Sequence, residues 1–194
     1  MGKTHVYEEI CTQKREVDAR VLEQTVSLAV EIAREGREGR KIGTLFVVGD
    51  VDNVLARSRS LLLDPLYGHA SELLDVRSAE FRETVKELAQ LDGAFVVDKH
   101  GTFVSAARYI DVDPSVQLLP GLGTRHAAAA SVTSQTKAVG VVVSQSSIVR
   151  VYAGGEIRAE IVPELFLLAR EGLFASDAAV RQVPEAGITM AVAD

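Results

Sequence analysis

The fold class is decided by residues 91–110, which read LDGAFVVDKHGTFVSAARYI. A run of β-favouring residues, 95–97, is followed by the turn residues Asp98-Lys99-His100-Gly101 and then by a second such run, 102–109. Two short runs of this kind joined by a glycine-containing turn are typical of an antiparallel hairpin. We therefore predict a strand-turn-strand unit in the middle of the chain.

Helices and one buried strand are predicted on the N-terminal side of this hairpin. Residues 15–35 repeat apolar side chains every three or four positions, and the same spacing recurs in a helix from Ser78, a favourable N-cap. Residues 45–48 form a short apolar run that indicates a buried strand. Residues 53–63 are ambiguous and are expected to start as a helix, before a loop at 64–69 that contains Pro and Gly.

The C-terminal side is predicted to add a helix, more strands and a last helix. After a loop at 111–123, a helix should begin near Thr124, because an Ala-rich block follows. The tail from Ser176 shows no clear pattern. Three strands are predicted at 139–143, 148–152 and 157–162, with a Gly154-Gly155 turn between the last two and a helix from Pro163 to Ala169.

This order mixes hairpins with helical crossovers, so we predict an α/β (α+β) fold in which helices flank a mixed sheet. A length of 194 residues suits a single domain. We divide the chain into an N-terminal helical segment at 1–40, a main domain at 41–175 and a C-terminal tail at 176–194.

Composition excludes several classes of protein. The net charge of −6 argues against a nucleic-acid or anionic-membrane surface, for which a basic excess is expected. The single cysteine, Cys11, cannot form an internal disulfide. Neither a signal-like apolar segment at the start nor a run of about 20 apolar residues is present, so a cytoplasmic protein is expected.

Asp92-Gly93-Ala94 is the first candidate for chemistry. Asp92 is expected where a helix ends and a strand begins, and its carboxylate suits a hard divalent cation. Gly93 and Ala94 would let a base or phosphate approach the backbone. Taken alone, an Asp-Gly pair is more often only a turn.

The second candidate is Gly123-Thr124-Arg125-His126, at the entrance to the predicted Ala-rich helix. Free N–H groups and the helix dipole converge there on one spot, which forms a ready anion site. The alternative is an ordinary helix cap with an exposed Arg and a half-buried His. Ser144 to Ser147 could also bind phosphate, although a turn is the simpler interpretation. His69, in the loop at 64–69, could also contact a ligand, although a packed loop histidine is the simpler interpretation.

Taken in order, these segments resemble the diadenylate cyclase (DAC) domain, and most of all the stand-alone archaeal-type cyclases. The resemblance covers roughly residues 40 to 162. It includes Gly43-Thr44-Leu45-Phe46-Val47-Val48-Gly49-Asp50, Asp64-Pro65, Gly68-His69, Asp92-Gly93-Ala94, Gly123-Thr124-Arg125-His126 and Ser144.

The resemblance implies a sheet of about seven strands and a reaction that joins two ATP molecules into cyclic di-AMP. Two domains are expected to meet face to face as a homodimer or higher homo-oligomer, each with one ATP. Asp92, Arg125 and His126 are the implied catalytic residues, and Asp92 is the implied ligand of Mn²⁺ or Mg²⁺. The implied ATP-binding residues are Asp92, Gly93, Ala94, Ile110, Gly123, Thr124, Arg125, His126 and Ser144.

One position departs from the family pattern. Many relatives have Arg-His-Arg where this chain has Arg125-His126-Ala127. The missing cation could weaken phosphate binding, or Arg108 or Arg150 could replace it. A non-enzymatic module that binds ATP or cyclic di-AMP is therefore the alternative to an active cyclase.

Overall fold

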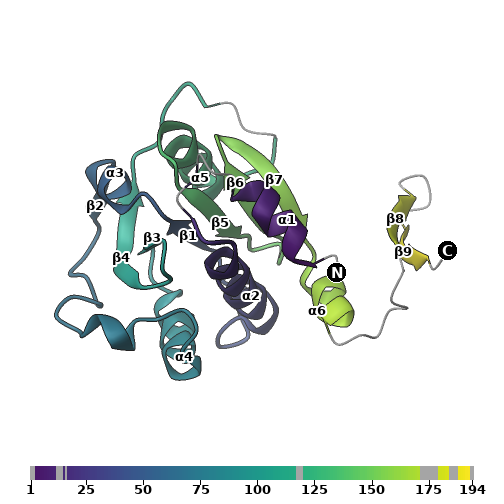
Figure 1. Ribbon diagram of the computed structural model, residues 1–194, viewed down its shortest axis with the longest axis horizontal. Helices are drawn as coiled ribbons and strands as arrows, with labels where there is room; N and C mark the ends of the chain where they lie inside the picture. The colour runs from purple at the N-terminus through teal and green to yellow at the C-terminus, as the bar shows by residue number, and fades with distance from the viewer. Residues whose placement is uncertain are drawn as a thin grey trace.

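Figure 1 shows the protein as a computed structural model, which describes residues 3–11, 15, 17–116, 120–170, 179–183 and 188–192. The helices are α1 (Lys3–Ile10), α2 (Ala19–Glu35), α3 (Val51–Ala56), the 3₁₀ helix η1 (Ser71–Leu73), α4 (Ala79–Leu88), α5 (Thr124–Gln135) and α6 (Pro163–Arg170). The strands are β1 (Thr44–Val48), β2 (Ser58–Ser60), β3 (Ala94–Val97), β4 (Phe103–Ile110), β5 (Val139–Val143), β6 (Val149–Ala153), β7 (Glu156–Ile161), β8 (Ala179–Val183) and β9 (Ile188–Val192).

The main sheet has seven strands in the order β2-β4-β3-β1-β5-β6-β7. Only the central pair, β1 and β3, is parallel, and every other neighbouring pair is antiparallel. The predicted mixed sheet flanked by helices is therefore confirmed. The predicted β3–β4 and β6–β7 hairpins are present, with Asp98 and Gly154-Gly155 in their turns.

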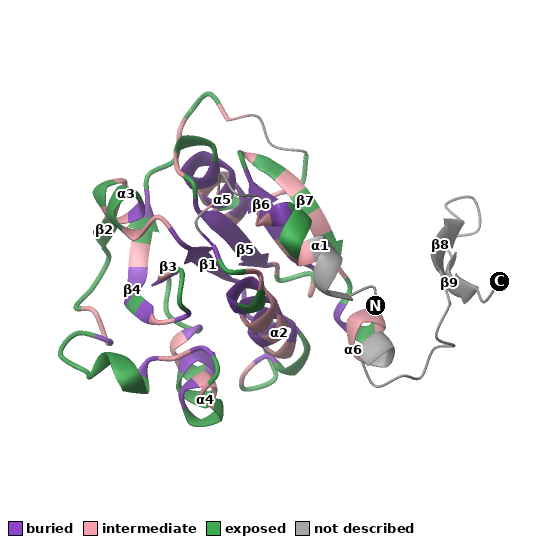
Figure 2. Cartoon of the chain, viewed as in Figure 1, coloured by how far each residue is buried: buried purple, intermediate pink, exposed green. Residues whose placement is uncertain are grey.

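Helices cover both faces of the sheet, so the central strands are buried on both sides (Figures 1 and 2). Alternate side chains of β1 enter two separate cores, as the pleat requires. Phe46 and Val48 belong to the core under α2 and α4, whereas Leu45 and Val47 belong to the core under α3 and α5. On the α4 side, Phe46 stacks on Phe95, its partner in β3, with ring centroids 5.2 Å apart.

A buried cation joins α2 to α4 at the edge of the first core. Lys86 of α4 is only 6% exposed and contacts Glu31 and Glu35 of α2 at 3.2 Å each, and Glu83 at 2.7 Å. Arg82, one turn earlier, also pairs with Glu31. A buried lysine needs such partners, because an unpaired buried charge is costly.

The structure differs from expectation where secondary structure is short. The predicted helical start at 53–63 is a six-residue helix, α3, followed by the edge strand β2 that pairs with β4. The helix predicted at 15–35 begins at Ala19, because Asp18 caps it by accepting a bond from the Arg20 N–H. Ser78 caps α4 as predicted, by accepting a bond from the Phe81 N–H.

Three further elements were not predicted individually, although α1 lies in the segment 1–40 that was expected to be helical. Helix α1 precedes α2, and in the tail β8 and β9 form a separate two-stranded antiparallel sheet. Within the residues described, none of the helices combines the length and apolar character needed to cross a bilayer.

Candidate active site

The backbone conformation and packing at position 93 require glycine, whether or not a ligand binds there. Its φ is +103°, in a region that residues with a side chain rarely adopt. A Cβ at Gly93 would lie 2.7 Å from the carbonyl carbon of Ala107, which itself has φ +51°. Strand β4 therefore passes directly against Gly93. The close packing of the two strands requires glycine here, in addition to the predicted approach of a base or phosphate.

Asp92 precedes this contact, in the turn between α4 and β3, and its side chain is 85% exposed. One carboxylate oxygen, Oδ1, accepts a bond from the Gly93 N–H at 3.0 Å and lies 3.5 Å from Nη2 of Arg125. The structure thus brings the two predicted motifs together, although Asp92 and Arg125 are 33 positions apart in the sequence.

Helix α5 begins at Thr124, as predicted, with Gly123 as its N-cap. Gly123 has no side chain that could cap the helix, and its carbonyl accepts bonds from the His126 and Ala127 N–H groups. The N–H groups at the start of a helix have no partner within it. This end of α5 therefore presents the positive end of its dipole to a cavity.

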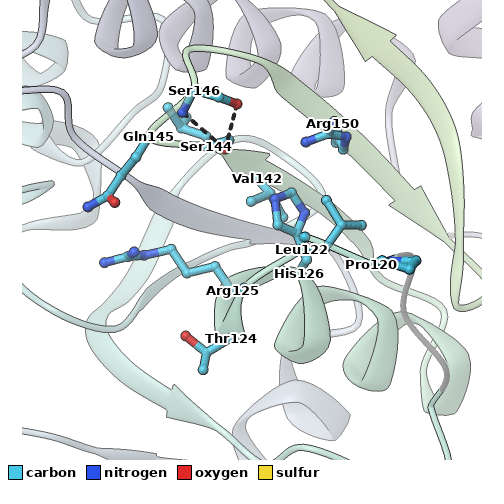
Figure 3. A pocket seen from close by; sticks show the side chains of 13 residues that line it. Pro120, Leu122, Thr124, Arg125, His126, Val142, Ser144, Gln145, Ser146 and Arg150 are labelled. Carbon is cyan, nitrogen blue, oxygen red and sulfur yellow. Dashed lines mark hydrogen bonds between the residues drawn. The ribbon is translucent and has the colours of Figure 1, made fainter.

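That cavity, of about 620 Å³, lies between the start of α5, the end of β5 and the start of β6 (Figure 3). A second cavity, of about 270 Å³, lies beside it at the start of β3 and the end of β4. We call them the phosphate cavity and the base cavity. Thr124 and Arg125 line both.

The predicted residues divide between the two cavities. The phosphate cavity is lined by Gly123, His126 and Ser144 as well as the shared pair, together with Pro120, Gly121, Leu122, Val142, Val143, Gln145, Ser146 and Arg150. The base cavity is lined by Asp92, Gly93, Ala94 and Ile110, together with Leu45, Leu61, Arg108, Tyr109, Val112 and Ala128. Every predicted site residue therefore lines one cavity or both.

Arg125 crosses the boundary between the cavities. Its Nη1 would lie 3.0 Å from a Cβ at Gly43, so the absence of a side chain there makes room for the guanidinium. The Nε of Arg125 is buried without a hydrogen-bond partner among the described residues. Gly43 was part of the resemblance, but its contact with Arg125 was not predicted.

His126 is buried, only 4% exposed, and its Nδ1 lies 3.0 Å from the hydroxyl of Tyr152. Burial, assisted by the positive charge of Arg150, lowers the pKa of His126 from 6.5 to about 4. The imidazole is therefore neutral at pH 7. It can donate one hydrogen bond to an anion but cannot offer a positive charge.

Tyr152 was not recognised from the sequence. It is almost fully buried, at 1% exposure, on the face of β6 that meets α5. The sequence signal that could have identified Tyr152 is its place two positions after Arg150 in a predicted strand, which puts both residues on one face of the sheet. Its pairing with His126 depends on how β6 packs against α5. His69, by contrast, lines a separate groove beside α4 and does not join this site.

A match to a protein family agrees with this arrangement. A family model designated DAC and described as DisA bacterial checkpoint controller nucleotide-binding matches residues 31–157, which is more than half of the chain. The chain belongs to the DAC family.

Two archaeal relatives of this DAC chain are named diadenylate cyclase. The protein from Methanocaldococcus jannaschii is 42% identical over 167 residues, which cover 86% of this chain and 53% of the relative. The protein from Haloferax volcanii is 35% identical over 151 residues, 77% of this chain and 55% of the relative. The DAC chain thus spans about half the length of the curated relatives it matches.

A solved structure supports the fold of the DAC chain. It is a Bacillus cereus protein described as a hypothetical membrane spanning protein, with a TM-score of 0.57 and 19% identity, covering 79% of this chain and 68% of that one. At this identity the likeness concerns the fold alone.

The donor set of the DAC site suits one type of metal ion. Among the described residues, no three His, Cys, Asp or Glu side chains gather to hold an ion. Of the described residues that line the two cavities, Asp92 alone carries a carboxylate. One carboxylate fits Mg²⁺ or Mn²⁺ bound chiefly through substrate phosphates and water, and does not fit a metal held by protein alone.

Proposed function

We propose that this chain is a diadenylate cyclase that condenses two ATP molecules into cyclic di-AMP and two pyrophosphates. The observation that carries the proposal is the position of Arg125, which lies between the base cavity and the phosphate cavity beside the carboxylate of Asp92. The names of the two archaeal relatives support the same activity.

The base cavity is suited to adenine. Leu45, Ala94 and Ile110 are buried apolar residues that line it, and a flat base gains free energy by leaving water for such a surface. The phosphate cavity is suited to a triphosphate, because the N-terminus of α5 and the hydroxyls of Thr124 and Ser144 line it. The α-phosphate would then lie at the junction, beside Arg125.

The reaction proposed at this junction is an in-line displacement. The 3′-oxygen of one ATP attacks the α-phosphorus of the other, the bond to the β-phosphate oxygen breaks, pyrophosphate leaves, and the hydroxyl proton is released. Arg125 binds the α-phosphate and stabilises charge there, and neutral His126 donates a hydrogen bond. A divalent cation held by Asp92 and phosphate oxygens would lower the pKa of the 3′-hydroxyl.

Both 3′-hydroxyls must react, so each ATP needs a site of its own. The two cavities of one chain suit the base and the phosphates of one nucleotide. We therefore propose that two copies meet with their active sites facing one another.

The test is to incubate the purified chain with ATP and either Mg²⁺ or Mn²⁺ and to identify products by mass spectrometry. Cyclic di-AMP is expected. Asp92→Asn should lower the rate at least about a hundredfold, because it removes the carboxylate for the metal. Asp52→Asn, an exposed change in α3 away from both cavities, should leave the rate unchanged. ATP binding without product under either metal would contradict the proposal and favour a binding module.

A further inference from the structure

Arg150 is a partly buried cation that has no role in the reaction proposed above. It lies on β6, its side chain is only 14% exposed, and it lines the phosphate cavity. In Figure 3 the side chains of Arg150 and Arg125 lie on two sides of this cavity, with His126 between them in the view. Arg150 is also close enough to His126 for its charge to help lower the pKa of that imidazole.

The charged residues that line the phosphate cavity are all cationic. Of the described residues that line it, Arg125 and Arg150 are cationic, His126 is neutral, and none carries a carboxylate. Each arginine pairs with a carboxylate that does not line this cavity, Arg125 with Asp92 and Arg150 with Glu160. Two cations in the wall favour an anion with more than one charged group. Because Arg125 also reaches Asp92 and the base cavity, Arg150 is the cation that belongs to the phosphate cavity alone.

A hydrogen bond to the protein orients the Arg150 guanidinium but leaves some of its donors for a ligand. Its Nε donates to Glu160 of β7, the residue directly opposite it in the β6–β7 register. Across the described part of the chain, its two terminal amino groups have no hydrogen bond to protein. A guanidinium fixed through Nε and open at both Nη atoms is arranged to grip phosphate oxygens in pairs.

Arg108, the other arginine able to replace the cation missing at Ala127, is placed differently. It lines the base cavity, and its Nε, Nη1 and Nη2 all donate to Ser58, Ser60 or the Leu55 carbonyl. Its donors are therefore already used to join β4 to β2. This leaves Arg150 as the replacement.

We propose that Arg150 binds the β- and γ-phosphates of ATP and so selects a triphosphate over a monophosphate. This inference rests on the proposed function, because it takes the phosphate cavity to be the triphosphate site. Glu160 acts as a positioning residue that orients the guanidinium. Arg150 would also hold the pyrophosphate as it leaves.

The experiment measures the affinities of two ligands that cannot react, 3′-deoxy-ATP and 3′-deoxy-AMP. Each nucleotide is titrated into the protein in a calorimeter, with Mg²⁺ present throughout. Arg150→Met should weaken 3′-deoxy-ATP binding by about 10- to 100-fold, the usual loss for a charge-assisted pair, and change 3′-deoxy-AMP binding by less than about twofold. Arg158→Met is the matched control. Arg158 is an arginine of the same hairpin, 48% exposed, that pairs with Glu156 and lines neither cavity. It should change neither affinity.

Arg150→Lys covers the case in which the methionine variant fails to fold. It keeps the charge but loses the paired donors, so the preference for triphosphate over monophosphate should fall by about three- to tenfold. An unchanged preference in either folded variant, or an equal loss for both ligands, would overturn the role of Arg150. If the wild-type chain binds 3′-deoxy-ATP and makes cyclic di-AMP, that failure leaves the proposed function intact. If it binds no nucleotide, the proposed function itself fails.

Discussion

His126 illustrates how burial changes what a residue can contribute. The sequence predicts an anion site at Gly123-Thr124-Arg125-His126, with a half-buried His as part of the alternative interpretation. In the structure His126 is buried against Tyr152 and stays neutral, whereas Arg125 lies at the junction of the cavities beside Asp92. If His126 donates to phosphate through Nε2, the Tyr152 hydroxyl must donate to Nδ1, because neutral imidazole carries one N–H.

Stability should therefore depend on His126 between two pH values. The unfolded state takes up a proton near pH 6.5, but the folded state does so only near pH 4. The free energy of unfolding should thus fall as pH is lowered through this window, by at most about 1.4 kcal/mol per pH unit from this group. Urea unfolding of the wild type and His126→Gln at pH 7, 6 and 5 measures it.

The variant His126→Gln should lose this part of the pH dependence. His100→Gln, a change in the exposed β3–β4 turn, should retain it. Equal slopes for the wild type and His126→Gln would show that His126 is not held neutral by burial.

The β3–β4 pair shows how an irregular element shapes the base cavity. Its register shifts twice between Ala94 and Val97, and Ala107 adopts a positive φ on the opposite strand. Such bulges bend a strand and redirect its side chains. Here Gly93, Arg108 and Ile110, all close to the bulge, line the cavity.

Gly93→Ala should therefore be destabilising by about 2–4 kcal/mol, because it adds a clash with the Ala107 backbone to the cost of a positive φ. Gly39→Ala is the matched control. Gly39 also has a positive φ, +72°, but nothing lies within 4 Å of its added Cβ, so a loss of about 1 kcal/mol is expected. Urea unfolding measures both, and equal losses would exclude the close approach of β4.

At the scale of the whole molecule, a sheet covered on both faces leaves the site at one end of its strands. The start of α5, the start of β3 and the end of β5 converge there, and residues far apart in the chain line adjoining cavities. Asp92 remains 85% exposed at this end. A carboxylate exposed in this way stays accessible to a second copy of the chain, as the proposed face-to-face dimer requires.

If two copies must meet, activity should depend on their encounter. At low protein concentration the rate of cyclic di-AMP formation should rise with about the square of the concentration, and it should become linear once dimers predominate. The assay is run over about a hundredfold range, with sedimentation velocity at the same concentrations. A strictly linear rate where sedimentation finds only monomers would contradict the requirement for a dimer.

The sequence alone determined the features that depend on neighbouring residues. The Ser78 cap, the turn at Asp98 and the start of α5 at Thr124 were all predicted, because each depends on hydrogen bonds or backbone preferences within a few positions. The site residues implied by the family resemblance line the two cavities, whereas His69 lies in a separate groove. Strand β2 was missed because it is three residues long and depends on pairing with β4.

Only the tertiary structure decided which of those residues contact one another and which cavity each of them lines. It pairs β1 with β3 in parallel, brings Asp92 to Arg125, and places Tyr152 beside His126. It also separates Arg108, whose donors are used within the sheet, from Arg150, which lines the phosphate cavity and makes its described hydrogen bond through Nε. Long-range contacts of this kind depend on the packing of several elements at once, which no local pattern encodes.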